Sequence, residues 1–84
     1  MKKKTIAVLG STGSIGQSTL DIIKKSKEFK VVLIFANKNT PKIIDQIKTF
    51  KPRLVIINNK KVYIKIKKKF KNKNIVFLND ITNV

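Results

Sequence analysis

The residues with the clearest chemical potential are three glycines at three-residue spacing, Gly10, Gly13 and Gly16, with hydroxyl side chains between them. They follow a short apolar run, residues 5–9, and lead into an amphipathic stretch, residues 15–27, that contains Gly16. A glycine turn between a strand and a helix lets the backbone approach a phosphate closely, because no Cβ intervenes. The free N–H groups at the start of the helix then face the anion. The pattern therefore predicts a loop that binds the pyrophosphate of a dinucleotide.

The spacing of this loop, G-x-x-G-x-x-G, differs from the G-x-G-x-x-G of simple NAD dehydrogenases. It is also not a P-loop, because no Gly-Lys-Ser or Gly-Lys-Thr follows it. The alternative interpretation is an ordinary Gly/Ser turn, which would have to contain three regularly spaced glycines. We expect Gly16, one turn into the helix, to let this helix pack closely on the strand.

A second polar group, Asn37-Lys38-Asn39, follows the second apolar run at residues 31–36. NAD-binding folds usually carry Asp or Glu at the end of the second strand, where it bonds the ribose 2′-hydroxyl. A carboxylate would repel a 2′-phosphate, whereas Lys38 would attract it and the two amides could donate to it. The missing acid therefore favours NADP over NAD. The alternative is that one more Lys in a Lys-rich chain carries no meaning.

These loops need strands and helices to position them. The apolar patterning predicts strands at residues 5–9, 31–36, 54–57 and 75–78 and helices at residues 15–27, 40–50 and 60–70. We expect Thr40 to cap the second helix, with Pro41 at its first position. Residues 60–70 also alternate as a strand would, but the strand–helix alternation before them favours a helix.

The predicted order is β-α-β-α-β-α-β, which indicates an α/β fold with an incomplete, Rossmann-like parallel sheet. Residues 31–36 are apolar on both faces, so we expect a central strand covered on both sides. Four strands would nevertheless leave two open edges and an incompletely covered face, and so short a chain buries a modest fraction of its surface. We expect marginal stability.

Composition excludes several classes of function. The 84 residues contain no Cys, His or Trp. This excludes a disulfide scaffold, a Cys/His zinc site and catalysis by a Ser-His-Asp or Cys-His group within this sequence. The longest apolar runs are too short for a membrane span or a signal-peptide core. We therefore expect no membrane partner and a cytoplasmic location.

The formal net charge is +16, which suggests nucleic acid as a partner. Nineteen of the twenty basic residues are Lys, however, whereas nucleic-acid sites usually rely on Arg. Lys, Ile and Asn all have AT-rich codons, so a biased genome would produce the same profile. A solvated Lys surface is the favoured interpretation. A small basic nucleic-acid-binding protein is the alternative, with Tyr63 among lysines as its one candidate for base stacking.

Residues 4–21, KTIAVLGSTGSIGQSTLD, closely resemble the amino-terminal segment of the 1-deoxy-D-xylulose 5-phosphate reductoisomerase family. The likeness continues through residues 29–32 and 36–39, is looser at residues 50–53 and fades after residue 59. It covers nearly all of this chain but only the opening part of the family's length. Another NADP-dependent oxidoreductase with a similar opening is the alternative within the enzyme class.

The resemblance implies an NADPH-dependent enzyme of the non-mevalonate isoprenoid pathway. Members isomerise 1-deoxy-D-xylulose 5-phosphate and reduce the product to 2-C-methyl-D-erythritol 4-phosphate, with Mg²⁺ or Mn²⁺, as cytoplasmic homodimers. It further implies that Thr12, Gly13, Ser14 and Ile15 hold the cofactor phosphates and that Asn37, Lys38 and Asn39 lie by the adenosine 2′-phosphate. Relatives often carry Gly at the position of Asn37.

The resemblance also implies what residues 1–84 lack. They would form the amino-terminal part of an NADP-binding Rossmann-like domain, with the catalytic and carboxy-terminal domains absent. The family's metal-binding carboxylates, substrate-phosphate site and lid lie further along, so we expect no catalytic or metal-binding residue here and no activity of this piece alone. Its four carboxylates, Asp21, Glu28, Asp45 and Asp80, show no spacing that indicates converging metal ligands.

Overall fold

The computed structural model describes residues 3–71 and 74–79, and in them four strands alternate with three helices. The strands are β1 (Lys4–Leu9), β2 (Phe29–Ala36), β3 (Leu54–Ile57) and β4 (Val76–Leu78), and the helices are α1 (Ser14–Lys25), α2 (Thr40–Phe50) and α3 (Lys60–Lys69). The predicted α/β order is confirmed, and each boundary lies within two residues of the expected one.

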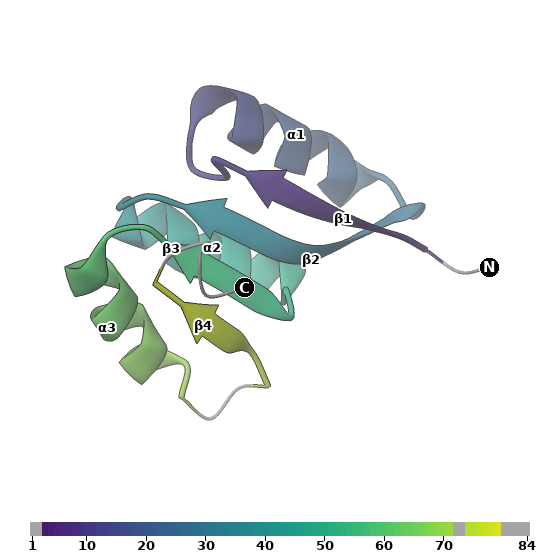
Figure 1. The fold of residues 1–84 in the computed structure, drawn as a ribbon. Helices are drawn as coiled ribbons and strands as arrows, with labels where there is room; N and C mark the ends of the chain where they lie inside the picture. The colour runs from purple at the N-terminus through teal and green to yellow at the C-terminus, as the bar shows by residue number, and fades with distance from the viewer. Residues whose placement is uncertain (1–2, 72–73, 80–84) are drawn as a thin grey trace.

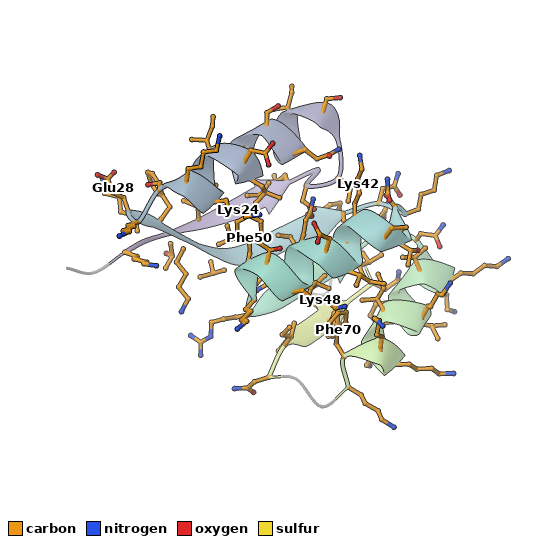
Figure 2. All side chains as sticks on the ribbon, turned by 180° about the vertical axis from the view of Figure 1, so that it is seen from behind. Lys24, Glu28, Lys42, Lys48, Phe50 and Phe70 are labelled. Atoms are coloured by element: carbon orange, nitrogen blue, oxygen red, sulfur yellow. The ribbon has the colours of Figure 1, made fainter. Side chains whose placement is uncertain are left out.

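The four strands form one parallel sheet in the order β1-β2-β3-β4, so each strand lies beside the one that precedes it in the chain (Figure 1). Right-handed crossovers that all step in one direction place their helices on the same face of a sheet. Figure 1 shows α2 behind the sheet, and the reverse view in Figure 2 shows it in front. The part of the chain that the structure describes therefore has a covered face and an open face.

The covered face carries the hydrophobic core. Its central row consists of four register partners, one from each strand, and all are at least nine-tenths buried: Val8, Ile34, Val55 and Phe77. All three helical segments contribute to the same cluster, with Leu20 and Ile23 from α1, Ile43 and Ile47 from α2, and Ile66 and Phe70 from α3 and its C-cap. Burying an apolar side chain of this size contributes about 1.5–3 kcal/mol. This face therefore supplies most of the stability.

The open face is as apolar as the covered one. Its residues are again register partners: Ala7, Leu9, Leu33, Phe35, Leu54, Ile56, Val76 and Leu78. None of them belongs to the cluster that the helices form, and Leu9 and Val76 on the two edge strands are 67% and 59% exposed. Residues 31–36 lie in a central strand, as expected, but the described helices cover only one of its faces, because every crossover steps the same way. On the other face Ile56 is nevertheless only 1% exposed. The expected incompletely covered face is confirmed.

Residues 60–70, whose pattern suited both a strand and a helix, form α3. Ile66 and Phe70 lie in the core, whereas Ile64 is 43% exposed. Only the helical spacing places the apolar stripe of this segment against the sheet, and the strand alternation would have buried Ile64 as well. The Asn59 side chain caps this helix by accepting a hydrogen bond from the Val62 N–H at 3.1 Å.

Helix α2 is capped differently from the expectation. Its N-cap is Asn39 rather than Thr40, and the Asn39 Oδ1 accepts a hydrogen bond from the backbone N–H of Lys42 at 3.3 Å. Thr40 is the first helical residue, and Pro41 follows it inside the first turn. Asn is at least as good a cap as Thr. A residue that the sequence assigned to a cofactor therefore also begins a helix.

Candidate nucleotide-binding site

The carboxyl ends of parallel strands meet at one edge of a sheet, and this edge gathers the predicted loops (Figure 1). The Ser11 N–H, after β1, donates to the Phe35 carbonyl on β2 at 3.0 Å. The Asn58 N–H, after β3, donates to the Ala36 carbonyl at 2.9 Å. A hollow of about 390 Å³ lies between these strand ends, lined by Leu9, Gly10, Phe35, Asn37 and Asn58. Each of the two groups picked out in the sequence thus contributes one residue to this hollow, Gly10 from the first and Asn37 from the second.

The glycine loop is folded by its own backbone. Gly10 has a φ of +66°, a conformation that residues with a Cβ rarely adopt, and the Gly13 N–H closes a turn by donating to the Gly10 carbonyl at 2.9 Å. A Cβ on Gly16 would overlap the Gly10 carbonyl oxygen and lie 2.8 Å from the Ser11 Cα. Gly16 is buried where α1 meets the loop. The predicted close packing of helix against strand is confirmed.

The amino end of α1 is open toward an anion. Its N-cap is Gly13, and no side chain caps it within the described residues. The first three N–H groups of a helix have no partner inside the helix, which here are those of Ser14, Ile15 and Gly16. No acidic residue lies in the first turn, so no carboxylate competes for these donors or for the positive end of the helix dipole.

Two glutamine amides hold the loop from either side. The Gln17 Nε2, on α1, donates to the Thr12 carbonyl at 2.8 Å. The Gln46 Nε2, on α2, donates to the Ser11 carbonyl at 2.7 Å in a buried contact between residues 35 positions apart. Ser11 is completely buried, whereas Thr12 is half-buried and Gly13, Ser14 and Ile15 are exposed. The loop therefore has an anchored inner part and an accessible outer part.

The loop after β2 presents side chains instead of backbone. Asn37, Lys38 and Asn39 are all exposed. The capping bond commits the Asn39 Oδ1 to α2, so only its amide nitrogen is left to donate to a ligand. Because Leu9 pairs with Phe35, the loop after β1 and the loop after β2 begin side by side. The structure therefore brings all seven predicted cofactor residues to one edge.

Four further residues of this edge were not predicted: Ser11, Gln17, Gln46 and Asn58. Ser11 and Asn58 had visible signals, since Ser11 lies in the glycine loop and Asn58 directly follows a strand end. Gln46 had only a weak signal, a polar residue within the apolar stripe of the second helix. Its contact with Ser11 could not be predicted, because it depends on how α2 crosses the sheet.

Metal-ligating groups do not gather in the described residues: no three of the acidic side chains come together. Asp21 and Asp45, both exposed, line a small hollow of about 110 Å³ between α1 and α2 with Lys24 and Lys42. Asp80 lies outside the described residues. No described helix combines the length and the apolar character that crossing a membrane requires.

The single candidate for base stacking is not a free platform. Tyr63 is half-buried and packs against the core. The Lys67 ammonium lies 5.5 Å from the centroid of the Tyr63 ring and donates to its hydroxyl at 3.3 Å. A base would have to displace this lysine before stacking, so the geometry gives no support to a nucleic-acid site here.

Comparison of the sequence with known proteins identifies one family. A sequence model of 1-deoxy-D-xylulose 5-phosphate reductoisomerase matches residues 6–81. The chain is 48% identical over 73 residues to the reductoisomerase of Buchnera aphidicola subsp. Schizaphis graminum, covering 86% of this chain and 18% of that one. It is 45% identical over 65 residues to the chloroplastic reductoisomerase of Oryza sativa subsp. japonica, covering 76% and 14%. The chain thus spans less than a fifth of the length of these relatives.

Solved structures give the same result for the fold. The 1-deoxy-D-xylulose 5-phosphate reductoisomerase from Zymomonas mobilis in complex with NADPH superposes with a TM-score of 0.82 at 29% identity, over 92% of this chain and 21% of that one. A reductoisomerase in complex with NADPH, fosmidomycin and magnesium reaches a TM-score of 0.86 at 23% identity, over 95% and 20%. The Rossmann-like fold class is confirmed.

Proposed function

The chain belongs to the 1-deoxy-D-xylulose 5-phosphate reductoisomerase family, as the resemblance of residues 4–21 indicated, and from this premise we propose that it binds NADPH. We propose further that residues 1–84 are the amino-terminal part of an NADP-binding Rossmann-like domain. The observation that carries the proposal is the amino end of α1 at the carboxyl edge of the sheet, which no side chain among the described residues caps. Gly10, three residues before its N-cap, lines the hollow between the strand ends. A relative solved with NADPH supports the proposal.

The outer part of the glycine loop is the proposed phosphate contact. Thr12, Gly13, Ser14 and Ile15 lie at the N-cap and the first turn of α1. Backbone N–H groups and the positive end of a helix dipole bind phosphate without any charged side chain. In this proposal the Thr12 and Ser14 hydroxyls add donors, whereas Ile15, 84% exposed, contributes its backbone and covers one side of the ligand.

The loop after β2 is the proposed contact of the adenosine 2′-phosphate. Lys38 would supply the positive charge, and the amides of Asn37 and Asn39 would donate to the phosphate oxygens. A hydrogen bond to a charged group contributes about 1.5–3 kcal/mol, enough to distinguish NADPH from NADH. The exposure of all three side chains is compatible with this role.

The activity of the whole enzyme remains a proposal for this chain. A longer protein that contains it would isomerise 1-deoxy-D-xylulose 5-phosphate and reduce the product, with Mg²⁺ or Mn²⁺ held by residues outside this sequence, as a homodimer in the cytoplasm. NADPH supplies the hydride in such chemistry, and the part of these residues would be to bind and orient it. We expect no catalytic residue here, and metal-dependent turnover of the substrate by the purified chain would refute that.

The test titrates NADPH into the isotope-labelled chain and follows the backbone amides by NMR, which detects weak binding. We expect saturable shifts concentrated in residues 10–16 and 37–39. The decisive variant is Gly13→Asp. Gly13 has an extended φ of −77°, which an Asp adopts readily, and Asp is a favourable N-cap. Its Cβ would lie 3.3 Å from the Gly10 carbonyl oxygen, so a small shift of the loop offsets the better cap. We therefore expect little change in thermal stability, while the negative charge repels the phosphates.

The matched control is Gly13→Asn, which offers a similar cap without the charge. We expect at least a tenfold loss of NADPH affinity for Gly13→Asp and a much smaller loss for Gly13→Asn. Shifts scattered over the whole chain, or equal affinity of Gly13→Asp and the wild type, would show that α1 does not bind the phosphates.

A further inference from the structure

Gln46 is an unusual residue for its position on α2. It is 7% exposed and lies between Ile43 and Ile47, which are in the core. Burying an amide has a free-energy cost unless its groups are hydrogen-bonded. Here the Nε2 is bonded to the Ser11 carbonyl, but the Oε1 has no partner among the described residues. An apolar residue would suit this helix face better, so stability alone does not explain the glutamine.

The hydrogen bond from Gln46 orients the peptide unit between Ser11 and Thr12. A trans peptide unit is planar, and its C=O and N–H point in opposite directions. Because Gln46 holds the Ser11 carbonyl toward α2, the Thr12 N–H of the same peptide unit points away from α2. The neighbouring N–H groups are already used, since Ser11 donates to Phe35 and Gly13 to Gly10, whereas Thr12 has no backbone acceptor in the described residues.

The amide of Gln17 holds the carbonyl of the next peptide unit, between Thr12 and Gly13. Gln17 holds the Thr12 carbonyl, so the two central carbonyls of the loop are both occupied by amide donors. A carbonyl oxygen facing a phosphate would repel it, whereas consecutive N–H groups form an anion-binding concavity. The Gly13 N–H, which belongs to the peptide unit held by Gln17, is bonded to the Gly10 carbonyl. The arrangement therefore turns two carbonyls away from a ligand and leaves the Thr12 N–H as the donor ahead of those of α1.

Gln46 also links the two proposed contact regions through a hydrogen bond. It lies on α2, the helix that begins at the Asn39 cap, and it bonds the loop that leads into α1. The phosphate loop and the 2′-phosphate loop are thus joined through one helix. Of the two amides, only that of Gln46 makes this connection, because Gln17 belongs to α1 itself.

We propose that Gln46 is a positioning residue of the nucleotide site: it turns the Thr12 N–H toward the cofactor phosphates and sets the loop against α2. The inference rests on the proposed function. It does not follow from the phosphate contacts assigned to the loop, because Gln46 is buried and its described hydrogen bond is to the loop backbone.

The test measures NADPH affinity for Gln46→Leu, which removes the amide donor and replaces it with an apolar side chain of similar size. We expect at least a tenfold loss of affinity in a chain that remains folded. The matched control is Ile47→Val, one position along the same helix, which thins the core without touching the loop. It should lower the thermal stability while leaving NADPH affinity within twofold of the wild type.

A measurement on the wild type covers the case in which Gln46→Leu does not fold. On addition of NADPH, the Thr12 amide proton should move downfield and the Gln46 side-chain amide should remain protected from exchange. A Thr12 amide that does not respond, while residues 14–16 do, would overturn the inference, and so would a folded Gln46→Leu that binds NADPH as tightly as the wild type. A wild type that shows no response to NADPH overturns the proposed function and the inference with it.

Discussion

Two loops at the same edge of the sheet are built in opposite ways. The loop after β1 is held by backbone and buried amides, with Ser11 inaccessible to solvent and Gly16 packed on Gly10. The loop after β2 is exposed, and its side chains point their polar groups into solvent apart from the Asn39 cap. Changes in the first loop should therefore affect folding and binding together. Changes in the second should affect the choice of nucleotide more than the fold.

The largest effect is expected for Gly16→Val. The new Cβ would meet backbone atoms of Gly10 and Ser11, which cannot rotate away as a side chain could. Overpacking of this kind costs about 3 kcal/mol, a large share of the stability of a small domain. Urea unfolding followed by circular dichroism should show a much lower midpoint. Gly13→Ala is the control, because its Cβ would approach the Gly10 oxygen only to 3.3 Å. Equal midpoints for Gly16→Val and Gly13→Ala would contradict the packing described for the loop.

The second effect concerns the other loop. Lys38→Glu should lower NADPH affinity by about tenfold to a hundredfold, the equivalent of one charge-assisted hydrogen bond. Affinity for NADH, which has no 2′-phosphate, should change little, and the unfolding midpoint should stay the same because Lys38 is exposed. Lys61→Glu on α3 changes the net charge equally and serves as the control. If both variants weaken NADPH to the same degree, only the overall charge matters and Lys38 has no specific role.

A smaller effect separates the two functions of Asn39. Asn39→Ala removes the cap of α2 and should cost about 1 kcal/mol of unfolding free energy. Asn59→Ala removes the equivalent cap of α3, so both variants should lower the midpoint by similar amounts. Only Asn39→Ala should also weaken NADPH, by a few fold. Identical binding by the two variants would reduce Asn39 to a capping residue.

The smallest effect is expected for Asn37→Gly. The Asn37 side chain is exposed and lines the rim of the hollow, but it makes no side-chain hydrogen bond within the described residues. NADPH affinity should change by less than twofold in the same titration. A tenfold loss of NADPH affinity would show that Asn37 is a main contact of the 2′-phosphate. It would contradict the expectation that this exposed side chain contributes little.

The same contrast explains what could be predicted from sequence. The glycine loop was recognisable because a positive φ and close packing require glycine itself at Gly10 and Gly16. The helix at residues 60–69 was predictable only through its context, since Val62, Ile64 and Ile66 alternate as a strand would. The cap of α2 was misplaced by one residue because Asn39 and Thr40 are both good caps.

Features that depend on tertiary arrangement could not be read from local pattern. An apolar run such as residues 31–36 indicates that both faces of a strand are suited to burial, but not whether anything covers them. The hydrogen bond between Gln46 and Ser11 joins α2 to the loop after β1, and it depends on how α2 crosses the sheet. In the sequence, Gln46 is only a polar residue within an apolar stripe, whereas the fold shows that its amide donates to the Ser11 carbonyl.

The consecutive strand order also bears on how the chain folds. Ala7 pairs with Leu33, Leu33 with Leu54 and Leu54 with Val76, so the residues that pair between strands are never more than 26 positions apart along the chain. Contacts of short sequence separation form quickly, because little chain entropy is lost before they are made. The described hydrogen-bond partners of the glycine loop outside it and α1 are Phe35 and Gln46, so none of them lies beyond α2. The glycine loop can therefore make its described hydrogen bonds without α3 or β4 in place.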